Sequence, residues 1–203
     1  DAVGRRILRT LRAEHVEAHV VVDPDVPTAL MLKDRPHLGR SRVTYYRHGN
    51  AGSRLSPADV ALDAIAAADV LHVTGIGLAL SPTSADAVLP AVRPAREVGT
   101  LVSFDVNHRS RLWGAEEAAA AYRSIAARAD VLFAGGDEAE LLTGEREPQR
   151  QADAIAALGP DQEVIKLGAD GAVGFEGGER VERLAFAVDA VDSVGAGDAF
   201  VAG

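Results

Sequence analysis

DSVGAGD, residues 192–198, is a glycine-rich segment near the end of the 203-residue chain. It follows an apolar, strand-like run at 184–188 and leads into 199–202, which has the character of a first helical turn. A strand, a glycine-rich turn and a helix start form an anion-binding arrangement, because the N–H groups at a helix N-terminus are unpaired and the helix dipole favours negative charge there. Gly195 and Gly197 carry no Cβ, so the backbone could approach a phosphate closely. The segment therefore predicts a phosphate site.

Asp198 does not suit a site that only holds phosphate, because its carboxylate would repel the anion. A phosphoryl-transfer enzyme, however, needs a base that accepts the proton of a hydroxyl group while N–H groups hold the transferred phosphoryl. The alternative is that Asp198 only caps a helix or complements its dipole. The spacing alone leaves both interpretations open.

The segment resembles the signature of the ribokinase-like (PfkB-type) carbohydrate kinases, Asp-Thr-x-Gly-Ala-Gly-Asp-x-Phe, with Ser193 in place of Thr. The matching residues are Asp192, Gly195, Ala196, Gly197, Asp198 and Phe200. The resemblance implies that Gly195, Ala196 and Gly197 form an anion hole and that Asp198 is the catalytic base. It also implies ATP and Mg²⁺ as cofactors.

Composition limits the possible partners. A chain of this length suffices for one α/β domain, and 47% hydrophobic and 25% charged residues are ordinary for a globular protein. The net charge of −9 argues against nucleic acid or an anionic membrane as a partner. There is no cysteine, and no apolar run approaches the roughly 20 residues that span a bilayer. We see no signal peptide and expect a cytoplasmic protein.

Both ends of the chain look cut. It has no initiator Met, and it stops at Gly203, one turn into the helix that follows the glycine-rich segment. An isolated helical turn is unstable without tertiary support. We therefore expect one incomplete domain over residues 1–203, part of a longer product.

Two patterns of secondary structure succeed one another along the chain. Three short strand candidates, at 19–22, 28–33 and 41–47, have no helix between them and predict a small β-sheet lid within residues 19–47. After residue 56, strands and helices alternate, which predicts a mostly parallel sheet covered on both faces. The expected helices are 2–13, 57–67, 82–98 (kinked or split by Pro90 and Pro94), 115–128, 136–143 and 149–158, and the expected strands are 69–74, 100–105, 130–134, 163–167 and a hairpin of 172–175 with 180–188. Together with the resemblance, this predicts a ribokinase-like three-layer α/β/α fold plus the lid.

The lid segment carries the clue to the substrate. Tyr45 and Arg47 point the same way along a strand, and a ring beside a guanidinium suits a small hydroxylated acid. The alternative is a solvated lid edge with one exposed Arg. Residues 44–53 resemble the Tyr-Tyr-Arg-x-x-Ser-Ala-(Gly/Ala)-Ser stretch of the 2-keto-3-deoxygluconate kinases in the same family, which implies that Tyr45, Tyr46 and Arg47 bind a sugar acid. Met31 stands where that group has a substrate-contacting Tyr.

Polar loops follow the expected sheet strands. Residues 105–113 resemble the Asp-x-Asn-x-Arg…Leu-Trp segment of the same kinases, which implies that Asn107 and Arg109 lie where ATP and sugar meet; read alone, Arg109 is equally a surface arginine beside a packed Trp113. Glu138 matches a family Glu linked to magnesium, although Gly135 replaces the usual Asn. Alternatively, Glu138 only favours the first turn of a helix.

The turn 166–172 has the spacing of a hairpin. It resembles the family's Gly-x-x-Gly turn beside the nucleotide, which makes Gly168 and Gly171 candidate ATP neighbours. Asp170, Lys166 and Gly195 complete the expected cofactor-binding set.

The sequence thus predicts an ATP-dependent kinase of a sugar acid, 2-keto-3-deoxygluconate being converted to its 6-phosphate. The family also allows a ribokinase or fructokinase relative that acts on a neutral sugar. A fragment without catalytic activity is the third alternative. The resemblance further suggests a homo-oligomer formed through the lid.

Overall fold

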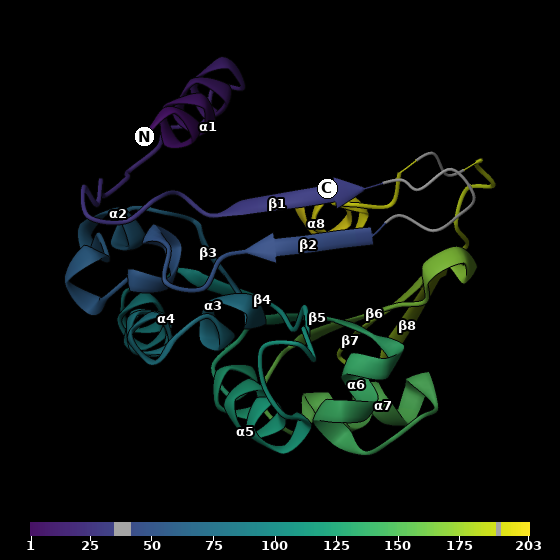
Figure 1. Ribbon diagram of the computed structural model, residues 1–203. Helices are drawn as coiled ribbons and strands as arrows, with labels where there is room; N and C mark the ends of the chain where they lie inside the picture. Colours follow the sequence, from purple (N-terminus) through teal and green to yellow (C-terminus); the bar gives the residue numbers. More distant parts are fainter. Residues whose placement is uncertain (35–41, 190–191) are drawn as a thin grey trace.

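A six-stranded sheet forms the centre of the computed structural model, which describes residues 1–34, 42–189 and 192–203 (Figure 1). The strands follow one another in sequence order: β3 Val70–Thr74, β4 Leu101–Asp105, β5 Val131–Gly135, β6 Gln162–Lys166, β7 Ala172–Glu176 and β8 Glu179–Arg183. β3 to β6 pair in parallel, and β7 and β8 add an antiparallel hairpin. The predicted mostly parallel sheet is therefore confirmed.

One face of this sheet carries the core. Because successive side chains of a strand point to opposite faces, the fully buried Val102, Phe104, Leu132 and Ile165 all lie on the same side. They form one cluster with side chains of the crossover helices, among them Ile125. The opposite face is more open, as the half-exposed Leu101 shows.

The main-chain crossovers explain this asymmetry. The helices are α2 Leu62–Ala66, α3 Gly75–Ala79, α4 Pro82–Val98, α5 Ala115–Ala126, α6 Gly136–Thr143 and α7 Pro148–Ala156. Right-handed crossovers that always step to the next strand in the same direction place their helices on the same face. Figure 1 shows α4 to α7 gathered on that side of the sheet.

The second face is covered in part by α8, Ala196–Ala202, the helix that follows the glycine-rich segment. The ring of Phe200 in α8 meets the ring of Phe133 in β5 edge to face, with centroids 6.5 Å apart. Within the described residues, no other helix makes a ring contact with this face of the sheet. It gives the fold its third layer.

The lid is a two-stranded antiparallel sheet of β1, Leu30–Asp34, and β2, Arg42–Tyr46. It stands apart from the main sheet in Figure 1, with α8 beside it. Lys33 of β1 pairs with Asp192, just before α8, so the lid contacts the glycine-rich segment. The strand predicted at 28–33 forms as β1 at 30–34, and the strand predicted at 41–47 forms as β2 at 42–46; residue 41 lies outside the described residues.

Two predicted strands do not form. Residues 19–22 are irregular, and Val20, Val21 and Val22 are 52%, 62% and 73% exposed. β8 ends at Arg183, so the apolar run 184–188 is irregular as well. Both runs have β-forming residues, but the described chain offers them no neighbouring strand, and strand propensity is effective only where a partner is present.

Two helices also differ from expectation. The helix predicted at 57–67 is divided into a 3₁₀ turn at Pro57–Asp59 and α2, with Val60 between them in an extended conformation. Asp59 accepts from the N–H of Ser56 at 2.9 Å and so caps the start of the 3₁₀ turn. Pro90 and Pro94 do not split α4. Its packed face holds the helix together, since Val92 and Ala95 are fully buried. The helix predicted at 2–13 is confirmed as α1, Ala2–Ala13, and none of its residues is buried.

Candidate active site

Asp198 lies in the first turn of α8 and faces the loop that follows β4. The side-chain amide of Asn107 donates to Asp198 Oδ1 at 3.5 Å, a long contact but a directed one. Asn107 is 9% exposed and adopts φ +40°, a left-handed conformation that Asn tolerates better than most residues. The structure thus brings together two residues 91 positions apart that the sequence assigned to the site.

The glycines before Asp198 have different reasons to be there. Gly195 has φ +82° and begins α8, so its conformation requires glycine. Gly197 is helical, and a Cβ built on it would meet nothing within 4 Å. Neither backbone conformation nor packing of the described chain therefore explains Gly197. The free space at this turn suits the close approach of a phosphate oxygen.

Glu138, in the first turn of α6, holds the β4 loop in place. Its Oε2 accepts from the N–H of Gly135 and its Oε1 from the N–H of His108, both at 2.7 Å. Both oxygens thus serve backbone donors, although each keeps a lone pair. Mg²⁺ usually retains several waters and takes few protein ligands, so a contact through water remains compatible with this geometry. The described residues contain no group of three His, Asp or Glu side chains able to hold a metal ion.

A buried tyrosine of α5 also contacts the loop after β4. Tyr122 of α5 has no exposed surface, and its hydroxyl lies 3.0 Å from His108 Nδ1. Burial raises the pKa of Tyr122 to about 12. The phenol is therefore protonated at neutral pH. Gly75 allows this packing, because a Cβ there would lie 2.6 Å from the Tyr122 ring.

Lys166, at the end of β6, forms an ion pair with Asp105, at the end of β4. Its Nζ lies 2.7 Å from Asp105 Oδ1, and the two side chains are 19% and 3% exposed. Since β5 lies between β4 and β6, the pair bridges the end of β5. The nucleotide role of Lys166 stays a prediction, because its ammonium already has a buried partner.

The turn after β6 contains the other predicted nucleotide neighbours. Gly168 and Asp170 belong to a 3₁₀ turn, and Gly168 has φ +62°. Gly171 has φ +102°, and a Cβ there would lie 2.0 Å from the carbonyl oxygen of Arg183. Gly171 is thus required by the turn itself, and contact of these three residues with a nucleotide stays a prediction.

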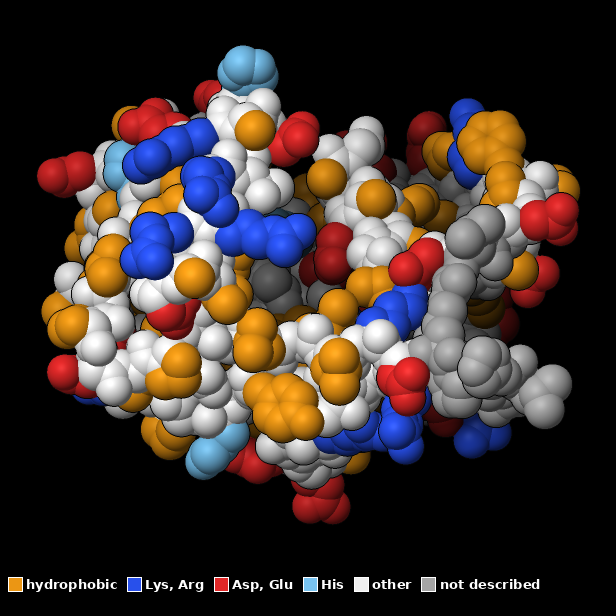
Figure 2. Space-filling model, turned by 45° about the horizontal axis from the view of Figure 1, so that its top comes forward, with side chains coloured by type: hydrophobic (Ala, Val, Ile, Leu, Met, Phe, Trp, Pro, Cys, Tyr) orange, Lys and Arg blue, Asp and Glu red, His pale blue; other side chains and the backbone are white. Residues whose placement is uncertain are grey.

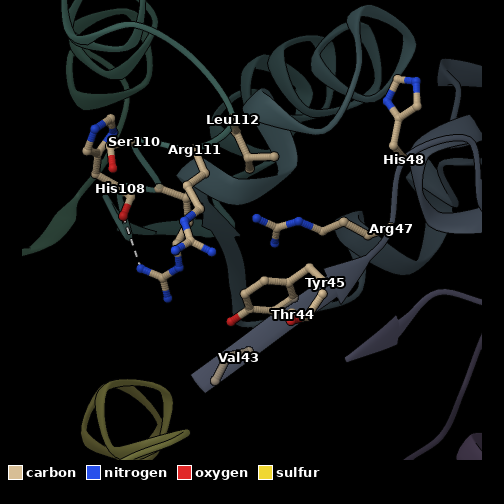
Figure 3. Close-up of a pocket in the computed structure, with 10 residues that line it drawn as sticks. Val43, Thr44, Tyr45, Arg47, His48, His108, Ser110, Arg111 and Leu112 are labelled. Atoms are coloured by element: carbon tan, nitrogen blue, oxygen red, sulfur yellow. Dashed lines mark hydrogen bonds between the residues drawn. The ribbon is translucent and has the colours of Figure 1, made fainter. Parts of the chain in front are cut away.

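A cavity of about 610 Å³ opens between the lid and the β4 loop. One wall comes from the lid side and the other from residues 108–112; the lining residues are Val43, Thr44, Tyr45, Arg47, His48, His108, Arg109, Ser110, Arg111 and Leu112. Figure 3 shows the side chains from the two walls converging, and Figure 2 shows a hollow in this face beside a group of Lys and Arg side chains.

Every charged side chain that lines the cavity is cationic, in a chain of net charge −9. The guanidinium carbon of Arg47 lies 4.4 Å from the ring centroid of Tyr45, a cation–π arrangement that leaves its N–H edges available. Arg109 Nη1 donates to the carbonyl of His108 at 3.1 Å. Such a cavity favours an anionic ligand.

Three of the five predicted substrate residues line the cavity. Tyr45, Arg47 and Arg109 line the cavity together, as the sequence predicted. Tyr46 and Met31 are not among the lining residues. Tyr46 follows Tyr45 in β2 and so points to the other face of the lid. Met31 pairs with Tyr45 across the ladder and so lies on the same face of the lid as Tyr45. Their contact with substrate stays a prediction.

Several site residues were missed by sequence reasoning. Arg111 and His48 line the cavity, Asp105 is the partner of Lys166, and Tyr122 supports His108. Arg111 could have been noticed, because it lies two residues after Arg109 in the same polar loop. Tyr122 gives no such signal, since one tyrosine on an alanine-rich helix is an ordinary core residue.

Comparison with known proteins places this geometry in context. The sequence pattern described as pfkB family carbohydrate kinase matches residues 1–203. A 2-dehydro-3-deoxygluconokinase of Thermoproteus tenax is 42% identical over 98% of this chain and 62% of its own length. A 2-dehydro-3-deoxygluconokinase of Bacillus subtilis (strain 168) is 38% identical over 100% of this chain and 64% of its own length. The chain thus spans less than two thirds of either relative.

Solved structures agree with this result. A PfkB protein from Polaromonas sp. JS666 superimposes with a TM-score of 0.91 and 34% identity, over 100% of this chain and 67% of that one. A fructokinase from Vibrio cholerae O395 in fructose, ADP and calcium ion bound form gives 0.86 and 32%, over 100% and 66%. This chain is therefore similar to sugar kinases in both fold and sequence.

No helix in the described part of the chain is long and apolar enough to cross a membrane.

Proposed function

Because the chain belongs to the pfkB family of carbohydrate kinases, we propose that it forms the greater part of an ATP-dependent kinase that phosphorylates a sugar acid. The substrate that the site fits best is 2-keto-3-deoxygluconate, and the product is its 6-phosphate. Two relatives with 42% and 38% identity, each named 2-dehydro-3-deoxygluconokinase, support this choice.

The observation that carries the proposal is the charge of the cavity. Its lining includes Arg47, Arg109 and Arg111 and no acidic side chain. The hydroxyl groups of a neutral sugar can accept guanidinium N–H groups, but a carboxylate also neutralises their charge and accepts in stronger, bidentate hydrogen bonds. Tyr45 adds an aromatic face that covers carbon atoms of the ligand.

Asp198 acts as the base in this proposal. It accepts the proton of the primary hydroxyl as the hydroxyl oxygen bonds to the γ-phosphorus of ATP and the bond from that phosphorus to the β–γ bridging oxygen breaks, releasing ADP. Asn107, at 3.5 Å, orients the carboxylate. The N–H groups of residues 195, 197 and 198 and the guanidinium of Arg109 stabilise the charge on the transferred phosphoryl, whereas the N–H of Ala196 donates to the carbonyl of Ser193 at 3.3 Å. Mg²⁺, when bound, would supply further positive charge to the phosphates, and Glu138 is the residue that would hold it, through water.

Glu138 and Tyr122 act indirectly, through His108. Glu138 fixes the backbone N–H of His108, and the Tyr122 hydroxyl fixes the His108 ring. His108 stands between Asn107 and Arg109 in the chain, so these two contacts set the positions of the residues that face Asp198 and the cavity. A shift of about 1 Å in such residues is enough to cost a large factor in rate.

A substrate panel tests the proposal. The full-length protein is assayed with MgATP and equal concentrations of 2-keto-3-deoxygluconate, 2-keto-3-deoxygalactonate, fructose and ribose, with ADP release as the readout. We expect kcat/KM to be at least about tenfold higher for the acids, the value of one retained charge-assisted hydrogen bond. A preference for fructose or ribose would instead support a kinase of neutral sugars, and no ADP release with any of the four would overturn the kinase proposal.

A further inference from the structure

The cavity holds one arginine more than the proposed reaction uses. Arg47 is assigned to the substrate carboxylate and Arg109 to the phosphoryl charge. Arg111 lines the same cavity, and within the described residues its guanidinium has neither an ion pair nor a hydrogen bond. An unpaired guanidinium that faces a cavity has its donors available for a ligand.

Arg111 and Arg47 come from opposite sides of the cavity. Arg47 follows β2 of the lid, whereas Arg111 belongs to the loop after β4. Figure 3 shows the two side chains extending toward each other across the space. Arg47 is held over the Tyr45 ring, with its guanidinium carbon 4.4 Å from the ring centroid, so one half of this pair is preorganised.

Arg109 is placed differently from these two arginines. It donates to the carbonyl of His108, next in the chain to Asn107, which contacts Asp198. Because Asn107, two residues earlier in the chain, contacts Asp198, Arg109 is assigned to the reacting end of the site. All three arginines line the same cavity, but Arg111 makes no hydrogen bond within the described residues.

The arrangement is unfavourable without an anion. Like charges that converge on one cavity repel each other, and they do so more strongly where water is excluded. No acidic side chain lines the cavity to offset this repulsion. A carboxylate has two oxygens and about four lone pairs, so it can accept from two guanidinium groups at once.

We infer that Arg111 is a specificity-determining residue, and that its guanidinium and that of Arg47 bind the carboxylate of the substrate from opposite walls of the cavity. This inference rests on the proposed function, because it concerns the acid group of a sugar-acid substrate. The three arginines then have different roles. Arg47 and Arg111 bind the carboxylate of the substrate, and Arg109 stabilises the transferred phosphoryl group.

Three variants of the full-length protein test the inference. Arg111→Gln removes the charge and keeps most of the length, and Arg111→Lys keeps the charge but loses the planar fork. The matched control is Arg93→Gln, which removes the same charge from an exposed position on α4, outside the cavity. Steady-state kinetics are measured for 2-keto-3-deoxygluconate, for fructose and for ATP.

We expect Arg111→Gln to raise KM for the acid by about tenfold to a hundredfold, the value of a lost charge-assisted hydrogen bond. The kcat value, the KM for ATP and the kinetics with fructose should stay within about threefold, because uniform binding is lost and not transition-state stabilisation. The KM of Arg111→Lys for the acid should lie between those of the wild type and Arg111→Gln, and the KM of Arg93→Gln should equal that of the wild type. An unchanged KM for the acid, or an equal rise with fructose, would overturn the inference.

A binding measurement separates this inference from the proposed function. Calorimetry with gluconate and with glucitol, its uncharged counterpart, needs no turnover. If the wild-type enzyme prefers a neutral sugar in the kinetic assay, the proposed function fails. The role of Arg111 then stands if Arg111→Gln weakens gluconate binding alone, and falls if gluconate binding is unchanged or if glucitol is affected equally.

Discussion

The lid and the main sheet differ in what holds them together. The lid has two strands, and Leu30, Leu32 and Tyr46 on them are about half exposed. The main sheet instead packs Phe104 and Leu132, which have no exposed surface, under the crossover helices. Yet both contribute to the same cavity. In the proposed function, the sheet side supplies rigidity, the reacting groups and Arg111, whereas the lid supplies Tyr45 and Arg47, which contact the substrate.

This division has a physical reason. A catalytic base must be held within a fraction of an ångström, and only a packed scaffold fixes side chains so closely. Contacts that select a substrate can be made from a thin, exposed element, because they have to favour only one bound ligand over another. The lid can therefore change its residues at little cost to the stability of the whole.

The largest effect is expected on the sheet side. Asp198→Asn removes the base while keeping the shape of the side chain, so kcat should fall by about 10²–10⁴-fold, whatever the sugar. The KM for ATP should change little. Steady-state kinetics of the full-length protein provide the measurement.

Asp86→Asn is the matched control, because Asp86 is exposed on α4, away from the cavity. It should retain wild-type activity. Near-normal turnover of Asp198→Asn would rule out the base assignment and would move the chemistry away from α8.

The next effect concerns stability. Phe104→Ala removes a fully buried ring beneath the crossover helices and should lower the free energy of unfolding by about 3–5 kcal/mol. Leu32→Ala, on the lid, removes a side chain that is 57% exposed and should change it by less than about 0.5 kcal/mol. Urea unfolding of both variants compares the two regions directly. Equal losses would show that the lid is part of the cooperative core.

A smaller effect depends on pH. Burial on β6 raises the pKa of Glu163 to about 7, with weaker contributions from Asp153 and Asp161. The unfolded chain therefore releases this proton at lower pH than the folded chain, and stability falls as pH rises from about 4.5 to 7. Glu163→Gln removes this penalty, so it should be more stable than the wild type at pH 8, by up to about 3 kcal/mol, and similar to it at pH 4.

Glu179→Gln, at an exposed position on β8, is the control and should show no pH-dependent gain. Denaturant unfolding at pH 4, 6 and 8 gives the measurement. A constant difference between Glu163→Gln and wild type across these pH values would contradict a raised pKa of Glu163.

The sequence predicted the parts of this molecule that depend on local pattern. The alternating strands and helices after residue 56 were found because periodicity and punctuation by Gly and Pro are local signals. The runs 19–22 and 184–188 were predicted wrongly, because their strand character needs a neighbour that residue pattern does not reveal. The cationic loop 108–112 was recognised only at Arg109.

Contacts across the fold were beyond sequence reasoning. The Lys166–Asp105 pair depends on β5 lying between β4 and β6. The support of His108 by Tyr122 depends on the packing of α5 beneath the β4 loop. Asn107 and Asp198 were both assigned to the site by resemblance, but their contact follows from the docking of α8 on the open face of the sheet.

The most direct test of the division between lid and sheet is the ratio of kcat/KM for 2-keto-3-deoxygluconate to that for fructose, measured for the full-length wild type and for Arg47→Ala. The account predicts that the variant loses at least about tenfold of this ratio, because one charge-assisted contact with the carboxylate is gone, while kcat/KM for fructose stays nearly constant. An equal loss of kcat/KM for both sugars would contradict it, since Arg47 would then serve the reaction itself and not the choice of substrate.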